Sequence, residues 1–180
     1  GAHIHYLSGI KNPIGLKVGP STDVDQLKKN IEILNPDNEE GRLTLIVRMG
    51  ANKISDTFPK LLKELKSLGQ NITWICDPMH GNTVTSSSGY KTRNSKDVLA
   101  EIKTFFDIHN AEGTIAGGVH LELTGLNVTE CVGGPEDIKD ENLGDRYHTF
   151  CDPRLNVNQS LELCFLLADL FPKGAIANNK

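Results

Sequence analysis

The feature that most constrains this chain is a pattern that occurs four times. Each copy is a short apolar run, then a few turn residues, then a stretch with apolar residues at helical spacing. The apolar runs are residues 14–18, 43–48, 72–76 and 119–123. Runs of about five residues flanked by Gly and Pro favour strands over segments of buried helix. Because each interval between runs has room for a crossover helix, the pattern predicts successive βαβ units, a parallel sheet and an α/β fold.

The stretches between and after these runs predict helices. Ser21, Thr22 or Asp23 can cap the first helix, and Gly69 and Gly113 occupy the position that glycine prefers just after a helix. The predicted helices cover residues 24–34, 58–68, 98–112 and 160–170. The broad apolar face of the last helix predicts packing against the core.

Composition narrows the class of protein. The chain has 180 residues, a net charge of −4 and 38% hydrophobic residues, which is ordinary for a globular domain and excludes a low-complexity or disulfide-dense chain. We therefore expect residues 1–180 to form a single domain. The mild acidity argues against a nucleic-acid partner, and no apolar run has the roughly 18 residues of a membrane helix. With no signal peptide at its start and no C-x-x-C pair, the chain is predicted to be cytoplasmic with reduced thiols.

Ionisable side chains stand where the predicted strands end. Lys17 is near the end of the first, Arg48 ends the second, Asp77 and His80 follow the third, and Glu122 alternates with leucines on the fourth. Parallel α/β proteins place their chemistry at this edge of the sheet. A single Lys or Arg here is more often a surface charge. Because an unpaired charge is costly to bury, charged groups at all four ends indicate a ligand or ion that compensates them.

Two kinds of group can be distinguished. His80, Glu122 and the later Asp152 offer nitrogen and oxygen donors suited to a divalent cation. Lys17 and Arg48 suit a phosphate or a carboxylate, Arg as a two-pronged donor. The three donors are far apart in the sequence. An equal alternative to a metal site is therefore that the histidine is hydrogen-bonded in the core and the two carboxylates are solvated. Ligands of one ion must lie within roughly 5 Å of each other, and we expect this of the three donor atoms.

The segment 81–94 is rich in Ser, Thr and Gly and has no apolar periodicity. A long segment of this kind predicts a mobile lid or a phosphate-binding loop, with a plain surface loop as the alternative.

Several motifs are long enough to carry a resemblance, among them Cys-Asp-Pro-Met-His-Gly-Asn-Thr and Gly-Gly-Val-His-Leu-Glu-Leu-Thr-Gly. The motif segments are residues 12–20, 48–50, 76–83, 89–93, 117–125, 127–131 and 147–156. In this order, they closely resemble the type II (plant-like) DAHP synthases, which open the shikimate pathway of aromatic amino acid biosynthesis. The likeness runs from residue 1 to about residue 170.

The resemblance implies a (β/α)₈ TIM barrel, of which this chain is similar to the C-terminal half. A barrel typically needs about 250 residues, so a chain with four strands leaves two open sheet edges. The family's N-terminal half supplies a cysteine metal ligand and an arginine for phosphoenolpyruvate, and none of the cysteines here lies in that motif. We expect the open edges to be covered by the missing N-terminal half or by self-association, or the chain to flatten into a doubly wound sheet.

The same five residues take roles by resemblance. His80, Glu122 and Asp152 match the family's metal ligands, and Lys17 and Arg48 match residues that bind phosphoenolpyruvate. The implied metal is manganese or cobalt, and no residue is assigned as a catalytic acid or base. Three further cationic side chains are expected near the same end of the strands, where they would support substrate binding; they are Lys91, Arg93 and Arg154.

The implied reaction is an aldol-type condensation. The methylene carbon of phosphoenolpyruvate attacks the aldehyde of erythrose 4-phosphate, water adds to the resulting cationic carbon, and inorganic phosphate leaves, giving DAHP. Two alternatives remain beside this enzyme. One is a non-catalytic half-barrel fragment that binds metal or phosphate only weakly, and the other is a metal-dependent hydrolase or aldolase on another barrel.

Overall fold

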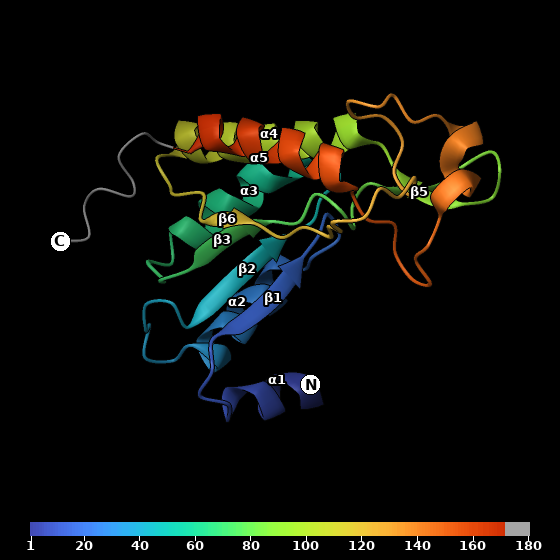
Figure 1. The fold of residues 1–180 in the computed structure, drawn as a ribbon. Coiled ribbons are helices and arrows are strands. Elements are labelled where there is room, and N and C mark those ends of the chain that lie inside the picture. The colour runs from blue at the N-terminus through green and yellow to red at the C-terminus, as the bar shows by residue number, and fades with distance from the viewer. Residues whose placement is uncertain (172–180) are drawn as a thin grey trace.

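A computed structural model describes residues 1–171 and contains one main sheet of four parallel strands (Figure 1). The strands are β1 (Ile14–Val18), β2 (Leu43–Val47), β3 (Thr73–Cys76) and β6 (Gly118–Val119), and they lie side by side in chain order. The register places Val18 beside Val47 and Val47 beside Cys76, so the strands end at one level. The predicted α/β fold with parallel βα units is confirmed.

Helices connect and flank these strands. They are α1 (Ala2–Ser8), α2 (Val24–Leu34), α3 (Ile54–Lys66), α4 (Ser95–Glu112) and α5 (Val157–Leu170), with a 3₁₀ helix at Asp140–Arg146. The Asp23 carboxylate accepts the Gln26 N–H and caps α2, and Gly113 ends α4 in the left-handed conformation with φ +62°. The short helix α1 has no counterpart in the sequence prediction. Within residues 1–171, no helix combines the length and the hydrophobicity needed to cross a membrane.

The helices cover one face of the sheet. Because the strand order follows the chain, crossovers of one hand place the connecting helices on the same side. The burial of the β2 side chains supports this arrangement, since Leu43, Leu45 and Val47 are buried while Thr44 and Ile46 on the other face are only half-buried. The sheet is therefore singly wound, and the doubly wound alternative is wrong. Its other face is not covered by any described helix.

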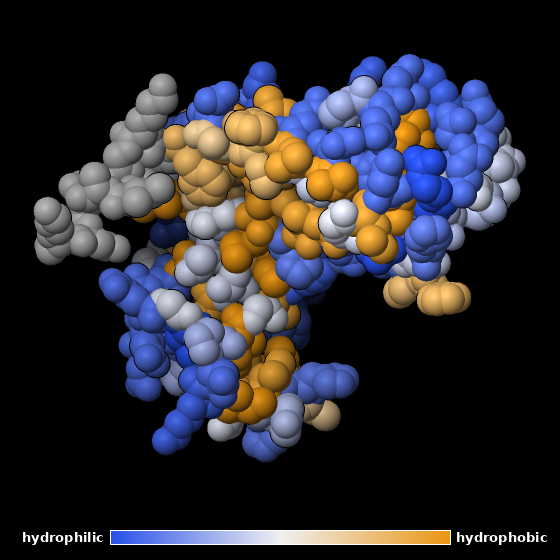
Figure 2. Space-filling model, viewed as in Figure 1, coloured by the Kyte–Doolittle hydropathy of each residue, from blue (hydrophilic) through white to orange (hydrophobic). Residues whose placement is uncertain are grey.

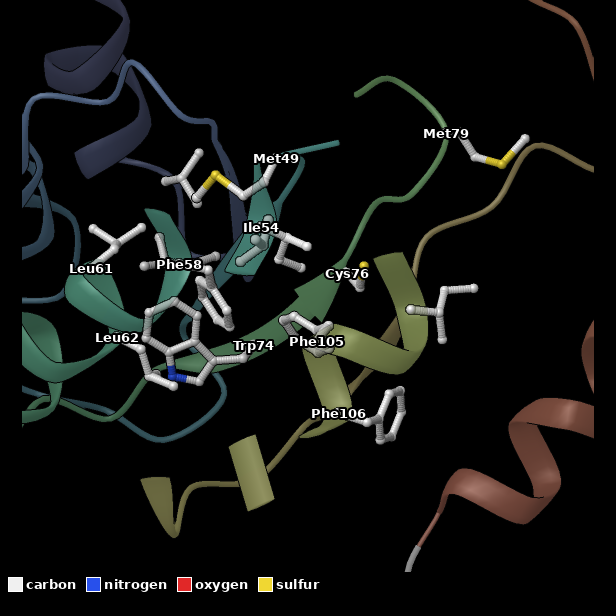
Figure 3. Close-up of a cluster of buried hydrophobic side chains, with 14 of the residues drawn as sticks. Met49, Ile54, Phe58, Leu61, Leu62, Trp74, Cys76, Met79, Phe105 and Phe106 are labelled. Carbon is white, nitrogen blue, oxygen red and sulfur yellow. The ribbon is translucent and has the colours of Figure 1, made fainter. Parts of the chain in front are cut away.

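Aromatic rings form the centre of the core between sheet and helices (Figure 3). The ring of Phe58 lies 5.7 Å from that of Trp74 and stacks on that of Phe105 at 5.3 Å. His109 packs edge-on against Phe105 at 4.5 Å, and its burial lowers the pKa of its imidazole to about 4. The histidine is therefore a neutral core residue.

The fourth strand is shorter than predicted. Only Gly118 and Val119 pair with β3, and the chain leaves the ladder at His120, whose N–H still donates to Cys76 O at 2.7 Å. The prediction of a strand over 119–123 is therefore wrong, and Glu122 lies in a loop. Beside β6 no further strand is present among residues 1–171 to pair with its other edge.

The segment 81–94 is a hairpin and not an irregular loop. Strands β4 (Thr83–Thr85) and β5 (Lys91–Arg93) pair antiparallel, and the turn contains Gly89 at φ +86°. The Tyr90 ring packs 4.7 Å from that of Tyr147, which anchors the hairpin to the loop before α5. The segment is therefore paired and not a plain surface loop, and the mobile lid stays a prediction.

Candidate metal and anion site

Three loops at the carboxyl edge of the sheet deliver the polar groups of the site. In Figure 1 the strand arrows point toward the hairpin and the long segment that precedes α5. His80 lies in the turn after β3, Glu122 in the loop after β6, and Asp152 in the loop before α5. The last two loops are joined by short parallel pairing: Thr124 N–H donates to Leu155 O, and Leu155 N–H to Glu122 O, both at 3.0 Å. This pairing brings Asp152 next to Glu122.

The three predicted donors converge on one point. His80 Nε2 lies 3.5 Å from Glu122 Oε1 and 3.6 Å from Asp152 Oδ2. One donor atom from each residue lies within 4.8 Å of the others, and all three residues are half-buried. The expected convergence within roughly 5 Å is thus present.

Asp77 holds His80 in this orientation. Its carboxylate is fully buried and accepts the backbone N–H groups of Met79 and His80 at 3.0 and 3.1 Å. The same carboxylate lies 2.8 Å from His80 Nδ1. The Asp77 carboxylate thus holds the Nδ1 side of the ring, and Nε2 faces Glu122 and Asp152.

Asp77 also binds Lys17. The Lys17 ammonium donates to Asp77 Oδ2 at 2.6 Å and lies 3.3 Å from His80 Nδ1. Burial tends to raise the pKa of Asp77, but the hydrogen bonds from Lys17 and the His80 backbone hold it below its usual value. The carboxylate is therefore ionised and links the lysine at the end of β1 to the histidine after β3.

The hairpin supplies two further cations. The Lys91 ammonium pairs with Asp152 Oδ1, and Arg93 Nη1 pairs with Glu122 Oε2 and with Pro153 O. Arg93 is fully buried, and its Nη2 has no hydrogen-bond partner within residues 1–171. The Lys91 hydrogen bond lowers the pKa of Asp152. One carboxylate oxygen of Glu122 and one of Asp152 thus pair with a hairpin cation, and the other oxygen of each residue faces His80.

This arrangement fits a divalent cation. Two ligands about 2.1 Å from one ion at the tetrahedral angle are about 3.4 Å apart, close to the separations of His80 Nε2 from Glu122 and Asp152. The oxygen and nitrogen donors are those that manganese, cobalt and zinc accept. Three ligands from the chain also leave positions for a further ligand or a substrate.

The charges of the site balance before any ion enters. Three carboxylates face three cations; they are Asp77, Glu122, Asp152, Lys17, Lys91 and Arg93. A divalent cation would therefore leave an excess of positive charge, which favours an anionic ligand.

Arg48 stands at the same edge but is not part of this network. It follows β2, between β1 and β3, and its backbone N–H donates to Val18 O at 2.9 Å. Its side chain is exposed and has no hydrogen bond or ion pair to the rest of residues 1–171. Lys17 is thus anchored by Asp77 at the end of β1, and Arg48 extends toward solvent after β2.

Sequence reasoning gave too little weight to Asp77 and Arg93. Asp77 was visible as a charge directly after an apolar strand, but its contacts with both Lys17 and His80 depend on the fold. Arg93 faces the site because hairpin pairing turns it inward. Arg154, expected near the mouth, instead binds Glu130 with its guanidinium at 2.7 Å and lies outside the cluster.

Fold and site together define the class of the protein. It is an α/β protein of parallel βα units that gathers possible metal ligands and anion-binding cations at the carboxyl edge of its strands, as barrel enzymes do. Residues 1–168 match the class-II DAHP synthetase family, and the chain belongs to that family.

Two relatives show the extent of the likeness. The chain is 51% identical over 170 residues to the phospho-2-dehydro-3-deoxyheptonate aldolase AroG of Mycolicibacterium smegmatis. It is 54% identical over 170 residues to the phospho-2-dehydro-3-deoxyheptonate aldolase of Streptomyces coelicolor. Each alignment covers 94% of this chain but only 37% and 38% of the respective relatives. The chain therefore spans little more than a third of their length.

Proposed function

We propose that this chain carries the metal ligands and the phosphoenolpyruvate-binding cations of a DAHP synthase. The reaction joins phosphoenolpyruvate to erythrose 4-phosphate and releases inorganic phosphate, as part of aromatic amino acid biosynthesis in the cytoplasm. The observation that carries the proposal is the convergence of His80, Glu122 and Asp152 beside Lys17. Membership of the family supports the substrate pair.

The ligand set of the proposal is His80, Glu122 and Asp152. A divalent cation held there, manganese or cobalt, would supply Lewis acidity for the aldehyde oxygen of erythrose 4-phosphate. Asp77 orients His80 so that Nε2 faces the ion, and the hairpin cations fix which oxygen of Glu122 and Asp152 faces it.

Lys17 and Arg48 bind phosphoenolpyruvate in this proposal. Arg48 offers paired N–H donors that match a carboxylate or phosphate, while Lys17 is a compact charge placed within 3.3 Å of His80. Held between them, the anion lies beside the metal ligands, so its methylene carbon can approach a bound aldehyde. The same cations stabilise the charge that moves onto the departing phosphate.

The domain proposal is a half-barrel. Residues 1–180 would form four βα units of a (β/α)₈ barrel, and the face of the sheet left bare by α2, α3 and α4 would line its interior. The covering half is either the remaining length that the relatives possess or a second copy of this chain. A half-barrel that binds metal or phosphate weakly without turnover is the alternative function.

An assay of phosphate release by the complete gene product tests the proposal. We expect release to require both substrates, to stop after EDTA treatment and to return with Mn²⁺ or Co²⁺. Arg48→Lys should raise the KM for phosphoenolpyruvate about tenfold because the paired donors are lost. Arg42→Lys is the matched control, since Arg42 binds Leu34 O at the opposite end of β2 and should leave that KM unchanged.

Two results would contradict the proposal. One is phosphate release that is unaffected by complete metal removal, and the other is an unchanged KM in Arg48→Lys. The 180-residue chain alone should show no turnover and should not run as a monomer in size-exclusion chromatography. A monomeric chain that turns over both substrates would contradict the half-barrel.

A further inference from the structure

Glu101 is a buried carboxylate that the proposed ligand and substrate sets do not use. It lies on α4 and has no exposed surface. Its Oε1 accepts the backbone N–H groups of Met49 at 2.8 Å and Gly50 at 2.9 Å, and its Oε2 accepts Asn82 Nδ2 at 2.7 Å. A helix on the covered face of the sheet thus contacts the backbone of one loop and the Asn82 side chain of another, both at the carboxyl edge.

The first of these loops carries Arg48. Met49 and Gly50 follow Arg48 directly, and the next N–H, that of Ala51, donates to Asn82 Oδ1 at 2.9 Å. Three consecutive N–H groups after Arg48 are therefore held by Glu101 and Asn82. The backbone from which the Arg48 side chain extends has little freedom to move.

The second loop carries His80. Asn82 follows it by two residues, and Asn82 Nδ2 also donates to Pro78 O at 2.8 Å. The two loops touch without side chains between them: a Cβ on Gly81 would lie 2.4 Å from Gly50 N, and a Cβ on Gly50 would lie 2.7 Å from Gly81 O. A shift of one loop is therefore transmitted to the other.

We propose that Glu101 is a positioning residue that sets Arg48 at its working distance from His80. This proposal rests on the proposed function, because it assigns Arg48 to phosphoenolpyruvate. A carboxylate has only acceptors and can satisfy all three donors. An amide in its place would present N–H donors to Asn82 Nδ2, so the bond that ties Asn82 to α4 would be lost while the shape of the side chain is kept.

The test measures phosphoenolpyruvate binding by calorimetry in the complete gene product with saturating Mn²⁺. Glu101→Gln should raise the Kd about tenfold, since small displacements of binding groups have effects of this size or larger. Glu112→Gln is the matched control, because Glu112 lies on the same helix and forms a partly exposed ion pair with Lys63 at 3.2 Å. Its Kd should equal that of the wild type.

A second variant distinguishes positioning from general destabilisation. In Glu101→Gln/Asn82→Asp the new amide oxygen accepts the Met49 and Gly50 N–H groups, and its NH₂ donates to the new carboxylate at position 82. That carboxylate still accepts Ala51 N–H but cannot donate to Pro78 O, so the double variant should recover part of the lost affinity. A role in stability alone predicts no such rescue of Kd at temperatures where every variant is folded.

The outcomes are separable. A lower melting temperature in Glu101→Gln with an unchanged Kd overturns the positioning role, and so does an equal loss in Glu112→Gln. If Glu101→Gln does not fold, Asn82→Ala gives the same test from the other side, and an unchanged Kd there overturns the role. A wild-type protein that binds Mn²⁺ but no phosphoenolpyruvate overturns the proposed function, and the role of Glu101 with it.

Discussion

Two regions of this molecule are held together by different forces. Residues 14–76 contain three strands and two helices packed on a core of aromatic and aliphatic side chains. Residues 113–156 contain a two-residue strand and one 3₁₀ helix, and most of their length is loop. Yet this second region supplies Glu122 and Asp152, two of the three possible metal ligands.

Buried polar side chains take the place of a core in the second region. Glu130 has no exposed surface and accepts the N–H groups of His148, Thr149 and Arg154 as well as the Arg154 guanidinium. Burial tends to raise the pKa of Glu130, but Arg154 and these N–H donors hold it below its usual value. Asn156 contributes a similar anchor by donating to Val128 O at 3.0 Å.

The contrast teaches how the site is assembled. Hydrophobic burial places Lys17 at the end of a strand, where many equivalent apolar contacts stabilise its position. Satisfied buried polar groups place Asp152, and there each bond has a specific partner. A substitution in the core of the first region should therefore lower the stability of the fold without a specific effect on the site. A substitution of a buried polar group in the second region should lower both the stability and the affinity for the metal.

The largest effect is expected in the hydrophobic region. Phe58→Ala removes a fully buried ring between Trp74 and Phe105 and should lower the free energy of unfolding by about 4 kcal/mol. Urea unfolding followed by circular dichroism measures it. Phe150→Ala is the control, because the Phe150 side chain is fully exposed and should cost less than about 0.5 kcal/mol. Equal costs would show that the core is not where the structure places it.

A smaller loss of stability with a specific loss of binding is expected for Glu130→Ala. The change leaves three N–H groups and Arg154 without their acceptor and should cost about 3 kcal/mol. Because these bonds shape the loop of Asp152, Mn²⁺ affinity of the folded protein should also fall, by about tenfold. Glu141→Ala, in the exposed 3₁₀ helix, is the matched control and should change neither quantity. If Mn²⁺ affinity stays intact in Glu130→Ala, the two regions do not differ as described.

A pH-dependent effect is expected from His109. Its folded pKa of about 4 lies below its ordinary value of 6.5 because the ring is buried, so the unfolded chain binds the proton more readily. The stability it contributes is complete above pH 6.5 and is lost as pH falls toward 4, with about 2 kcal/mol gone by pH 5. Denaturant titrations of the wild type and His109→Phe at pH 7 and pH 5 measure this. The variant should lose about 2 kcal/mol less than the wild type over this interval, and an equal loss in both would contradict a neutral core histidine.

The fold of the first region was predictable because one kind of signal produces it. Apolar runs ended by Gly and Pro located β1, β2 and β3. Helical spacing located α2 to the residue and the end of α4, which begins three residues before its predicted start. The apolar-run rule failed for the fourth strand, because Leu121 and Leu123 alternate with polar residues as in a strand but lie in a loop. No strand is present in residues 1–171 to hold them in a ladder, so the chain turns toward Leu155 instead.

The residues of the candidate site could be predicted from the sequence, but the contacts between them could not. Charged residues at the ends of strands identified Lys17, His80 and Glu122, because the edge of a parallel sheet collects them. The contacts of Asp77 and Arg93 follow from tertiary placement, since Asp77 must reach from β3 back to β1. Glu130 anchors the loop that carries Asp152 through His148, Thr149 and Arg154. This loop has no periodicity, so a sequence pattern carries no signal for the contacts.

The hydrophobic surface over α5 marks a further difference between the regions. Figure 2 shows apolar side chains gathered on this helix, and its most exposed large apolar residues are Leu161, Phe165 and Leu166. The prediction that the broad apolar face of this helix packs against the core is therefore confirmed for only part of that face. Leu163 and Leu167 pack inward against α4, while the other side of the helix is open.

The central claim is that His80, Glu122 and Asp152 bind one divalent cation. Calorimetric titration of the metal-free protein with Mn²⁺ tests it directly, with His80→Ala as the variant and His120→Ala as the control. The His120 ring lies 6.3 Å from that of His80, so the control removes a neighbouring imidazole outside the cluster. We predict one Mn²⁺ per chain, a Kd raised at least about a hundredfold in His80→Ala and an unchanged Kd in His120→Ala. An unchanged Kd in His80→Ala, or a loss confined to His120→Ala, would contradict the claim.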